Sequence, residues 1–172
     1  MEQKEEGTTM RWLLLIFWLV LCFAAAGIGG SWTAREIPTW YRTLVRPSIA
    51  PPNRVFGPVW TLLYALMAVA AWRVSLAPSS SVRTTALALF LGQLALNFVW
   101  SLIFFRWHQI GWAFAEVLAL WAAILFCVLV FTRISSTAAW LMAPYLAWVT
   151  FASILNAAFW KLNKSPALSA LR

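Results

Sequence analysis

Five long apolar runs, separated by short basic segments, constrain the fold of this chain more than any other feature. Each run is long enough to cross the hydrocarbon core of a bilayer, which takes about 20 mostly apolar residues. The runs cover residues 12–30, 56–76, 84–105, 110–131 and 138–160. They are too long and too uniformly apolar for the strands of a membrane β-barrel, which alternate in polarity over about ten residues. The sequence therefore predicts an all-α integral membrane protein, a single domain over residues 1–172 built as a bundle of five transmembrane helices.

The composition excludes several other classes of protein. Only 10% of the residues are charged and 63% are hydrophobic, whereas a soluble domain carries about 25% charged residues and a disordered chain is poorer in apolar residues. The net charge of +8 requires no nucleic acid partner, because basic loops beside anionic lipid are its ordinary cause. One histidine and two cysteines cannot supply a typical zinc site. The sequence thus predicts neither a metal site nor a cofactor.

The orientation follows from the Lys and Arg residues near the ends of the spans. The side that holds the amino terminus carries Lys4, Arg11, Arg73, Arg83 and Arg133. The opposite side carries a larger set: Arg35, Arg42, Arg46, Arg54, Arg106, Lys161, Lys164 and Arg172. The first loop and the carboxyl terminus are therefore predicted to be cytoplasmic. The sequence leaves both a bacterial membrane and a mitochondrial or other organellar membrane open.

The first loop, residues 31–55, is predicted to fold rather than to act as a linker. It contains four prolines, which prevent one continuous helix. It also contains apolar side chains, among them Trp32, Trp40, Tyr41 and Leu44. A long loop with apolar residues of its own is typical of a lid or a binding loop. The alternative is a belt of aromatic residues at the depth of the lipid headgroups.

Aromatic and amide residues share faces of the predicted helices. The stripes at helical spacing are Trp60 and Tyr64 on the second span, Gln93, Asn97, Trp100 and Phe104 on the third, and Tyr145, Trp148, Ala152, Asn156 and Phe159 on the fifth. On the fourth, Trp112 lies one turn before Glu116, which is expected to be neutral or paired with an arginine. Amides in hydrocarbon turn inward, where they either join helices or line a pocket. Aromatic walls with small alanines suit a flat, largely apolar ligand.

Small residues predict two close contacts between helices. The segment from Ala24 to Gly30 favours the close approach of a neighbouring helix. Ala88 and Gly92 are four residues apart, a spacing that suits either a homodimer or tight packing inside one bundle.

Four long segments carry a resemblance to a known family. They are WYRTLVRP at 40–47, PPNRVFGPVWTLLY at 51–64, GQLALNFVWSLIFF at 92–105 and PYLAWVTFASILNAAFWKLN at 144–163. The chain resembles the TspO/MBR family (tryptophan-rich sensory protein, translocator protein or peripheral benzodiazepine receptor) over nearly its whole length. The resemblance implies a five-helix bundle, commonly a homodimer, whose first loop covers a pocket that opens toward the cytosol.

The resemblance also implies a function and a set of site residues. Its members are receptors or translocator-like proteins that bind porphyrins and heme, cholesterol and other sterols or lipids, and synthetic benzodiazepine or isoquinoline ligands. Carried over to this chain, the ligand-binding residues are Tyr41, Trp60, Tyr64, Asn97, Trp100, Trp112, Trp148, Ala152 and Asn156. One alternative is an enzyme that degrades porphyrin in light through Trp60, Trp148 and Tyr41. Another is a stress sensor that acts through a protein partner. The sequence favours binding over turnover, because it shows no general acid, base or metal.

The chain departs from the family pattern at two positions. Many members have Trp where this chain has Ile49. The proposed cholesterol motif of animal members has Tyr where this chain has Ala157, although Phe159 and Lys161 remain as expected sterol contacts, and such motifs are weak predictors. A porphyrin is therefore the preferred ligand.

Overall fold

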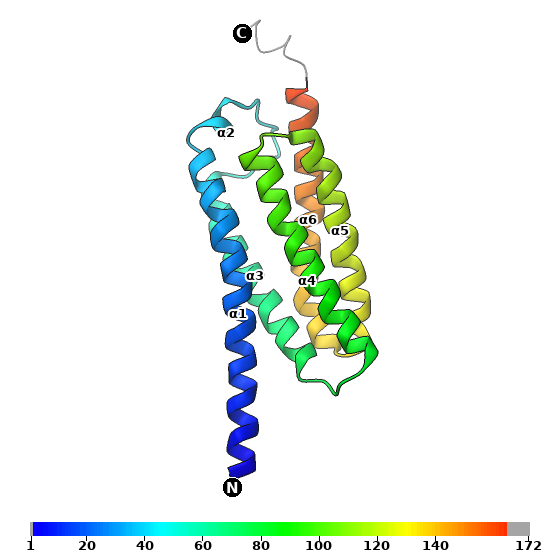
Figure 1. Ribbon diagram of the computed structural model, residues 1–172. Coiled ribbons are helices and arrows are strands. Elements are labelled where there is room, and N and C mark those ends of the chain that lie inside the picture. Colours follow the sequence, from blue (N-terminus) through cyan, green and yellow to red (C-terminus); the bar gives the residue numbers. More distant parts are fainter. Residues whose placement is uncertain (1, 165–172) are drawn as a thin grey trace, which may run out of the picture.

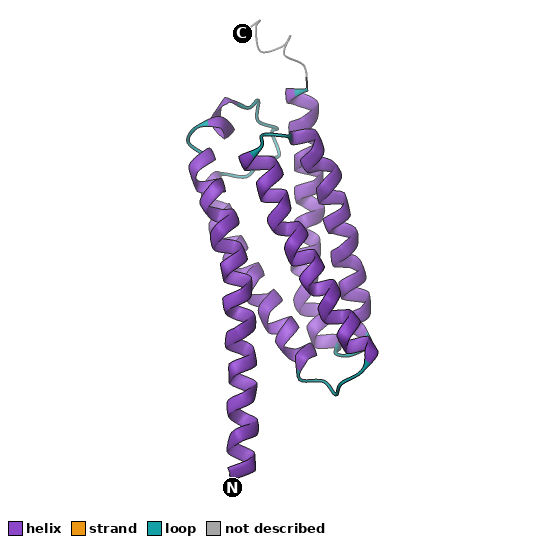
Figure 2. Cartoon of the chain, viewed as in Figure 1, coloured by secondary structure: helices purple, strands orange, loops and turns teal. Residues whose placement is uncertain are grey.

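The computed structural model describes residues 2–164, in which every regular element is helical (Figures 1 and 2). The elements are α1 (Glu2–Glu36), α2 (Trp40–Thr43), η1 (Asn53–Val55), α3 (Phe56–Ser75), α4 (Ser81–Ser101), η2 (Leu102–Arg106), α5 (Ile110–Thr132) and α6 (Ser136–Asn163). Within this part of the chain, five helical segments are long and apolar enough to cross a membrane. The predicted five-span, all-α architecture is therefore confirmed.

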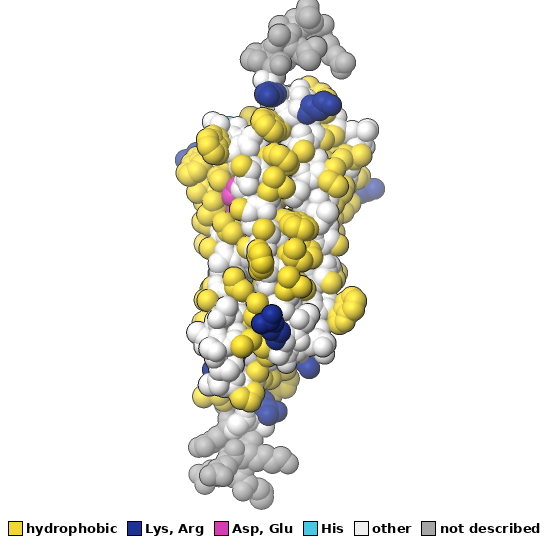
Figure 3. All heavy atoms as spheres, turned by 90° about the vertical axis from the view of Figure 1, so that its right-hand side faces the viewer, with side chains coloured by type: hydrophobic (Ala, Val, Ile, Leu, Met, Phe, Trp, Pro, Cys, Tyr) yellow, Lys and Arg dark blue, Asp and Glu magenta, His cyan; other side chains and the backbone are white. Residues whose placement is uncertain are grey.

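The long helices lie side by side along one axis, as Figure 1 shows. The amino terminus lies at one end, while α2 and the carboxyl end of α6 lie at the other. In the view of Figure 3, hydrophobic side chains cover the middle of the molecule and Lys and Arg lie toward its two ends. The first loop and the end of α6 thus share one side, as five spans require. Arg172, which entered the charge comparison, lies outside the described residues.

The first helix extends beyond the predicted range of 12–30 at both ends. Residues 2–11 contain no proline and include Glu, Gln and Lys, which are good helix formers, so the helix begins well before the apolar run does. It then continues to Glu36, two residues before Pro38, since the residue that precedes a proline disfavours helical geometry. The loop therefore starts after Glu36 and not at residue 31. The correction matters because it adds Thr33 and Ala34 to a transmembrane helix.

The third span does not end as a regular α-helix. A π-helical turn, η2, follows α4, and in it the Trp107 N–H donates to the Leu102 carbonyl at 3.0 Å. A π turn carries an extra residue, so the consecutive side chains Phe104 and Phe105 are both buried, 3% and 7% exposed. These two rings form part of the floor beneath the first loop.

Packing in the half of the bundle away from the first loop is apolar and close. Cys22, Met67, Phe90, Ile124 and Met142 are all fully buried there. Ser80 and Ser135 begin the two helices that start at this end, because each hydroxyl accepts a backbone N–H of the first turn. This half of the bundle is therefore a closely packed apolar core.

Candidate functional site

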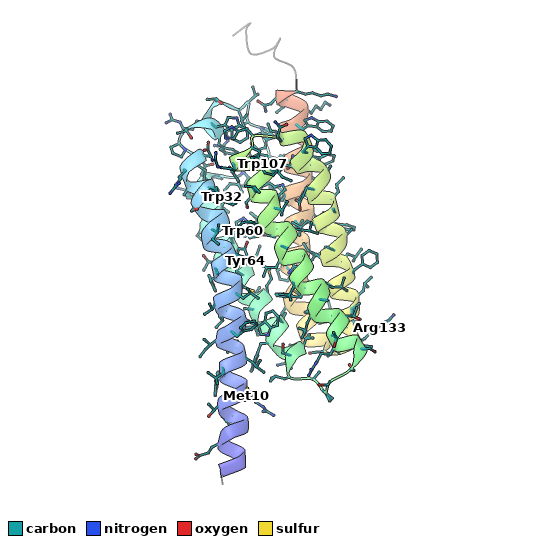
Figure 4. All side chains as sticks on the ribbon, viewed as in Figure 1. Met10, Trp32, Trp60, Tyr64, Trp107 and Arg133 are labelled. Atoms are coloured by element: carbon teal, nitrogen blue, oxygen red, sulfur yellow. The ribbon has the colours of Figure 1, made fainter. Side chains whose placement is uncertain are left out.

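A cavity of about 490 Å³ lies in the half of the bundle next to the first loop. Eight of the nine predicted ligand-binding residues line it: Tyr41, Trp60, Tyr64, Asn97, Trp100, Trp148, Ala152 and Asn156. They come from α2, α3, α4 and α6. Trp60 and Tyr64, labelled in Figure 4, lie one above the other near mid-height. The helical stripes read from the sequence therefore do meet around one space.

Trp112 does not join this group. Its side chain is 72% exposed, and α5 contributes no residue to the described cavity wall. The helix α5 packs on α4 and α6 at the far side of the bundle from α1 (Figure 1). The resemblance to the family assigned Trp112 to the ligand site, but this side chain faces away from the cavity.

The two expected sterol contacts face different surroundings. Phe159 is 1% exposed, lines the cavity and packs on Tyr41 with ring centroids 5.3 Å apart. Lys161 is exposed and lies outside the cavity lining. The two side chains therefore do not form one contact surface.

A buried hydrogen-bonded chain joins three helices behind the cavity wall. The Tyr64 hydroxyl of α3 donates to Asn97 Oδ1 of α4 at 2.5 Å. Asn97 Nδ2 in turn donates to the Tyr145 hydroxyl of α6 at 2.9 Å. Asn97 is 4% exposed and Tyr145 is fully buried. Asn97 thus connects helices and lines the cavity at the same time.

Nearer the first loop, the Asn156 side chain also lines the cavity and connects helices. Trp100 Nε1 donates to Asn156 Oδ1 at 3.1 Å, and Asn156 Nδ2 donates to the Ile110 carbonyl at 2.9 Å. These bonds connect α4, α5 and α6. Because both amides are already satisfied within the bundle, the cavity offers a ligand mainly aromatic surface with a few polar edges.

Gln93 is buried, as the inward stripe predicted, but it does not line the cavity. Its side chain is fully buried, yet neither amide atom has a hydrogen-bond partner among the described residues. It lies instead in an outer groove with Thr85, Ala88, Gly92 and Ala123. Glu116 likewise has both carboxyl oxygens buried without a partner in the described chain, so of the two expected states, neutral or paired with an arginine, the pairing is absent there.

The aromatic residues pack in three groups around the cavity. Trp60 lies 5.5 Å from Tyr64 and 6.2 Å from Tyr145 between ring centroids. Trp148 lies 5.6 Å from Phe151, and Trp100 stacks on Phe104 at 5.1 Å. Indole and phenol side chains combine large apolar faces with one polar edge. Aromatic walls of this kind can hold a planar hydrophobic molecule and orient it.

The first loop closes the end of this cavity. Tyr41 is 5% exposed and packs on Phe104, Phe105 and Phe159. Burial raises the pKa of the Tyr41 phenol above its usual range, and the nearby Arg46 guanidinium lowers it in part. The phenol therefore stays neutral around neutral pH.

Two sets of contacts fasten the loop. The Val45 N–H donates to Asn163 Oδ1 at 2.9 Å, and Asn163 Nδ2 donates to the Val45 carbonyl at 3.1 Å. On the other side, Trp40 stacks on His108 at 4.1 Å, and His108 Nε2 lies 3.1 Å from Glu36 Oε2. The loop is thus held by the last turn of α6 and by the turn between η2 and α5.

Sequence reasoning missed the contribution of α1 and of Asn53 to the cavity. The wall includes Gly27, Gly29, Gly30 and Ala34. The small residues from Ala24 to Gly30 were the available signal, but they were interpreted only as a packing contact. That interpretation fits Gly29, where a Cβ atom would meet Ser101 Oγ at 3.2 Å. It does not fit Gly27 and Gly30, which face open space.

Comparison with known proteins gives a consistent result. The TspO/MBR family model matches residues 8–161. A "Tryptophan-rich protein TspO" from Archaeoglobus fulgidus is 38% identical over 148 residues, which cover 84% of this chain and 94% of that protein. The human "Translocator protein" is 37% identical over 138 residues, 79% of this chain and 82% of that protein. A "Tryptophan-rich sensory protein" from Cereibacter sphaeroides is 36% identical over 154 residues, with 90% and 94% covered.

Proposed function

This chain belongs to the TspO/MBR family, and we propose that it is a membrane receptor or translocator-like protein for tetrapyrroles and other flat hydrophobic ligands. The observation that carries the proposal is the aromatic-walled cavity of about 490 Å³, a size within the usual range of small-molecule pockets. Porphyrin or heme is the preferred ligand. Benzodiazepine-type and isoquinoline compounds would use the same space.

Sterols are a weaker choice for this cavity. Ala157 stands where the sterol motif has Tyr. In addition, Phe159 faces the cavity while Lys161 is exposed outside it. A sterol held inside the cavity would contact Phe159 but not Lys161. Any sterol or lipid would have to bind through the aromatic wall alone.

The proposal also includes an orientation: the end of the cavity that the first loop closes lies on the cytoplasmic side of the membrane. Seven of the basic residues assigned to the cytoplasmic side belong to the described chain and flank the first loop, η2 or the end of α6: Arg35, Arg42, Arg46, Arg54, Arg106, Lys161 and Lys164. By the charge rule, the loop that closes the cavity faces the cytoplasm.

Binding is tested by titration of the purified protein with protoporphyrin in the dark, followed by tryptophan quenching. We expect Trp60→Phe and Trp148→Phe each to weaken affinity about threefold to tenfold, because one aromatic contact contributes about 0.5–1.5 kcal/mol. Trp112→Phe is the matched control, since the exposed Trp112 indole lies outside the cavity. The affinity of this variant for protoporphyrin should equal that of the wild type. Wild-type affinity in both cavity variants would contradict the proposed site.

The same samples distinguish binding from turnover under illumination. Trp60, Trp148 and Tyr41 line one cavity, and this favours light-dependent porphyrin degradation as the second candidate function. Porphyrin absorbance that decays in the wild type but not in Trp60→Phe or Trp148→Phe would establish the enzyme. Equal decay in all samples would leave a binding protein.

We also propose that the chain forms a homodimer through the outer groove of α4. This groove is lined mainly by small residues of α4, with Ala123 of α5 on its other side, and it can receive a helix of a second copy. The small residues Ala88 and Gly92 allow a second helix to approach closely. A second copy related by a two-fold axis would pack its own Ala88 and Gly92 into the same groove.

The dimer is tested by filling the groove. A Cβ atom at Gly92 would meet nothing within 4 Å, so Gly92→Leu should fold and should keep a second helix away. We expect the dimer fraction in lipid nanodiscs, measured by mass photometry, to fall about tenfold, a loss of about 1.4 kcal/mol in association. Ala95→Leu, on the exposed face of α4 outside the groove, is the control. An unchanged dimer in Gly92→Leu would exclude this interface.

A further inference from the structure

We infer that the cavity opens sideways into the bilayer between α1 and α3, and that a membrane-dissolved ligand enters through this opening without passing the first loop. The inference rests on the proposed ligand-binding function of the cavity. It concerns the route to that site and the kind of molecule that can take it.

Between the large lining residues Phe23 of α1 and Phe56 and Trp60 of α3, the facing edges of these two helices carry glycines and other small residues. Gly27 and Gly30 of α1 and Gly57 of α3 all line the cavity and are all exposed. A Cβ atom built at any of the three would meet no heavy atom within 4 Å. Ala34 and Thr61, which are also exposed lining residues, extend the same two edges. At these positions the seam is therefore lined by backbone and small groups on both sides.

The helix α1 leaves this seam open because it changes partners along its length. Away from the first loop it is fastened to α3, where Trp18 Nε1 donates to Ser75 Oγ and Trp72 Nε1 donates to the Arg11 carbonyl, both at 2.8 Å.

Nearer the loop, the same helix packs on α4 instead. A Cβ atom at Gly29 would touch Ser101, and the rings of Trp32 and Phe98 lie 5.2 Å apart. At this end α1 is therefore held by α4, while its exposed glycines border the cavity. The opening between α1 and α3 therefore results from the way in which α1 packs, and not from the absence of one side chain.

The opening lies at a depth where lipid, not water, surrounds the protein. Gly30 and Gly27 are six and nine residues before Glu36, the last residue of the α1 span. At 1.5 Å per residue these positions lie about 9 and 14 Å below that end. Chains of lipid therefore face the opening, and it selects ligands that partition into the membrane.

The route is tested by chemical access to the cavity wall, which does not depend on porphyrin binding. Ala152→Cys places a thiol in the cavity lining, and membrane-dissolved N-pyrenylmaleimide is added to the protein in phosphatidylcholine nanodiscs. Labelling above that of the parent protein, whose two cysteines are fully buried, reports entry. When Gly30→Leu is combined with Ala152→Cys, labelling should slow at least about fivefold, because the leucine side chain narrows the opening between α1 and α3.

Two matched variants make the result decisive. Ala24→Leu adds the same side chain to an exposed position of α1 outside the cavity lining, and should leave labelling unchanged. A disulfide between Val45→Cys and Asn163→Cys, formed before labelling, fastens the loop to α6 and should also leave the rate unchanged.

The opposite pattern, slow labelling with the loop fastened and normal labelling with Gly30→Leu, would overturn the inference. Absence of protoporphyrin binding in the wild type would instead refute the proposed function, and the labelling result would stand apart from it.

Discussion

Ala152→Phe is expected to abolish saturable protoporphyrin binding, with an affinity loss of at least about 100-fold, because a ligand in a cavity of about 490 Å³ cannot share its volume with a new ring. Ala152 lines the cavity one turn from Trp148 and one turn from Asn156. The phenyl group of the variant enters the empty space of the cavity. The loss in the free energy of unfolding should therefore stay below the value for an overpacked core, about 1–3 kcal/mol. Dark titration and thermal unfolding measure the two effects separately.

The control for this variant lies on the same helix. Ala147→Phe adds an identical ring at an exposed position of α6 outside the cavity lining, and it should bind like the wild type. If Ala152→Phe retained wild-type affinity while it remained folded, the ligand would have to bind elsewhere on the bundle.

The largest effect on stability is expected from Asn97→Leu. This change removes the central member of the Tyr64–Asn97–Tyr145 chain and leaves two buried hydroxyl groups without their partner. A buried unpaired polar group costs about 1–3 kcal/mol, although single hydrogen bonds between membrane helices average about 0.6 kcal/mol. We therefore expect a loss of about 2 kcal/mol in the free energy of unfolding, measured by reversible denaturation in mixed micelles.

A triple variant distinguishes the lost hydrogen bonds from poor packing. Tyr64→Phe and Tyr145→Phe, added to Asn97→Leu, remove the hydroxyls that the single change leaves unpaired. Replacing every member of a polar set by apolar groups can be nearly neutral, so at least about half of the lost stability should return. A triple variant no more stable than Asn97→Leu would show that the shape of the leucine side chain, and not the hydroxyl groups, caused the loss.

The sequence predicted the spans well because bilayer thickness imposes a length on every apolar helix. It also predicted most of the cavity, since Trp60, Tyr64, Asn97 and Trp148 alternate with small residues at helical spacing. The prediction of site residues failed where a tryptophan could face either lipid or a ligand. Trp112 faces outward, and an indole is as favourable against lipid as against a ligand.

Glycines were the second difficulty. Gly27 and Gly30 have no side chain to give a periodic pattern, so nothing in the sequence distinguishes Gly29, which packs on Ser101, from its neighbours, which border an opening. Which glycine packs and which borders the opening depends on the position of α1 relative to the other helices, and this is set by the tertiary structure. The helical start of α1 was missed for a simpler reason, because the prediction followed apolar length alone.

The π turn at η2 has a consequence for insertions and deletions in related chains. Phe104 and Phe105 both point inward because the turn from Leu102 to Arg106 contains one residue more than an α-helical turn. Deletion of any one of these residues would restore regular geometry and rotate all that follows by about 100° relative to α4. His108, with φ of 57°, and the start of α5 would then lose their alignment with Trp40 and Asn156. The length of this segment is therefore under stronger constraint than the identity of its side chains.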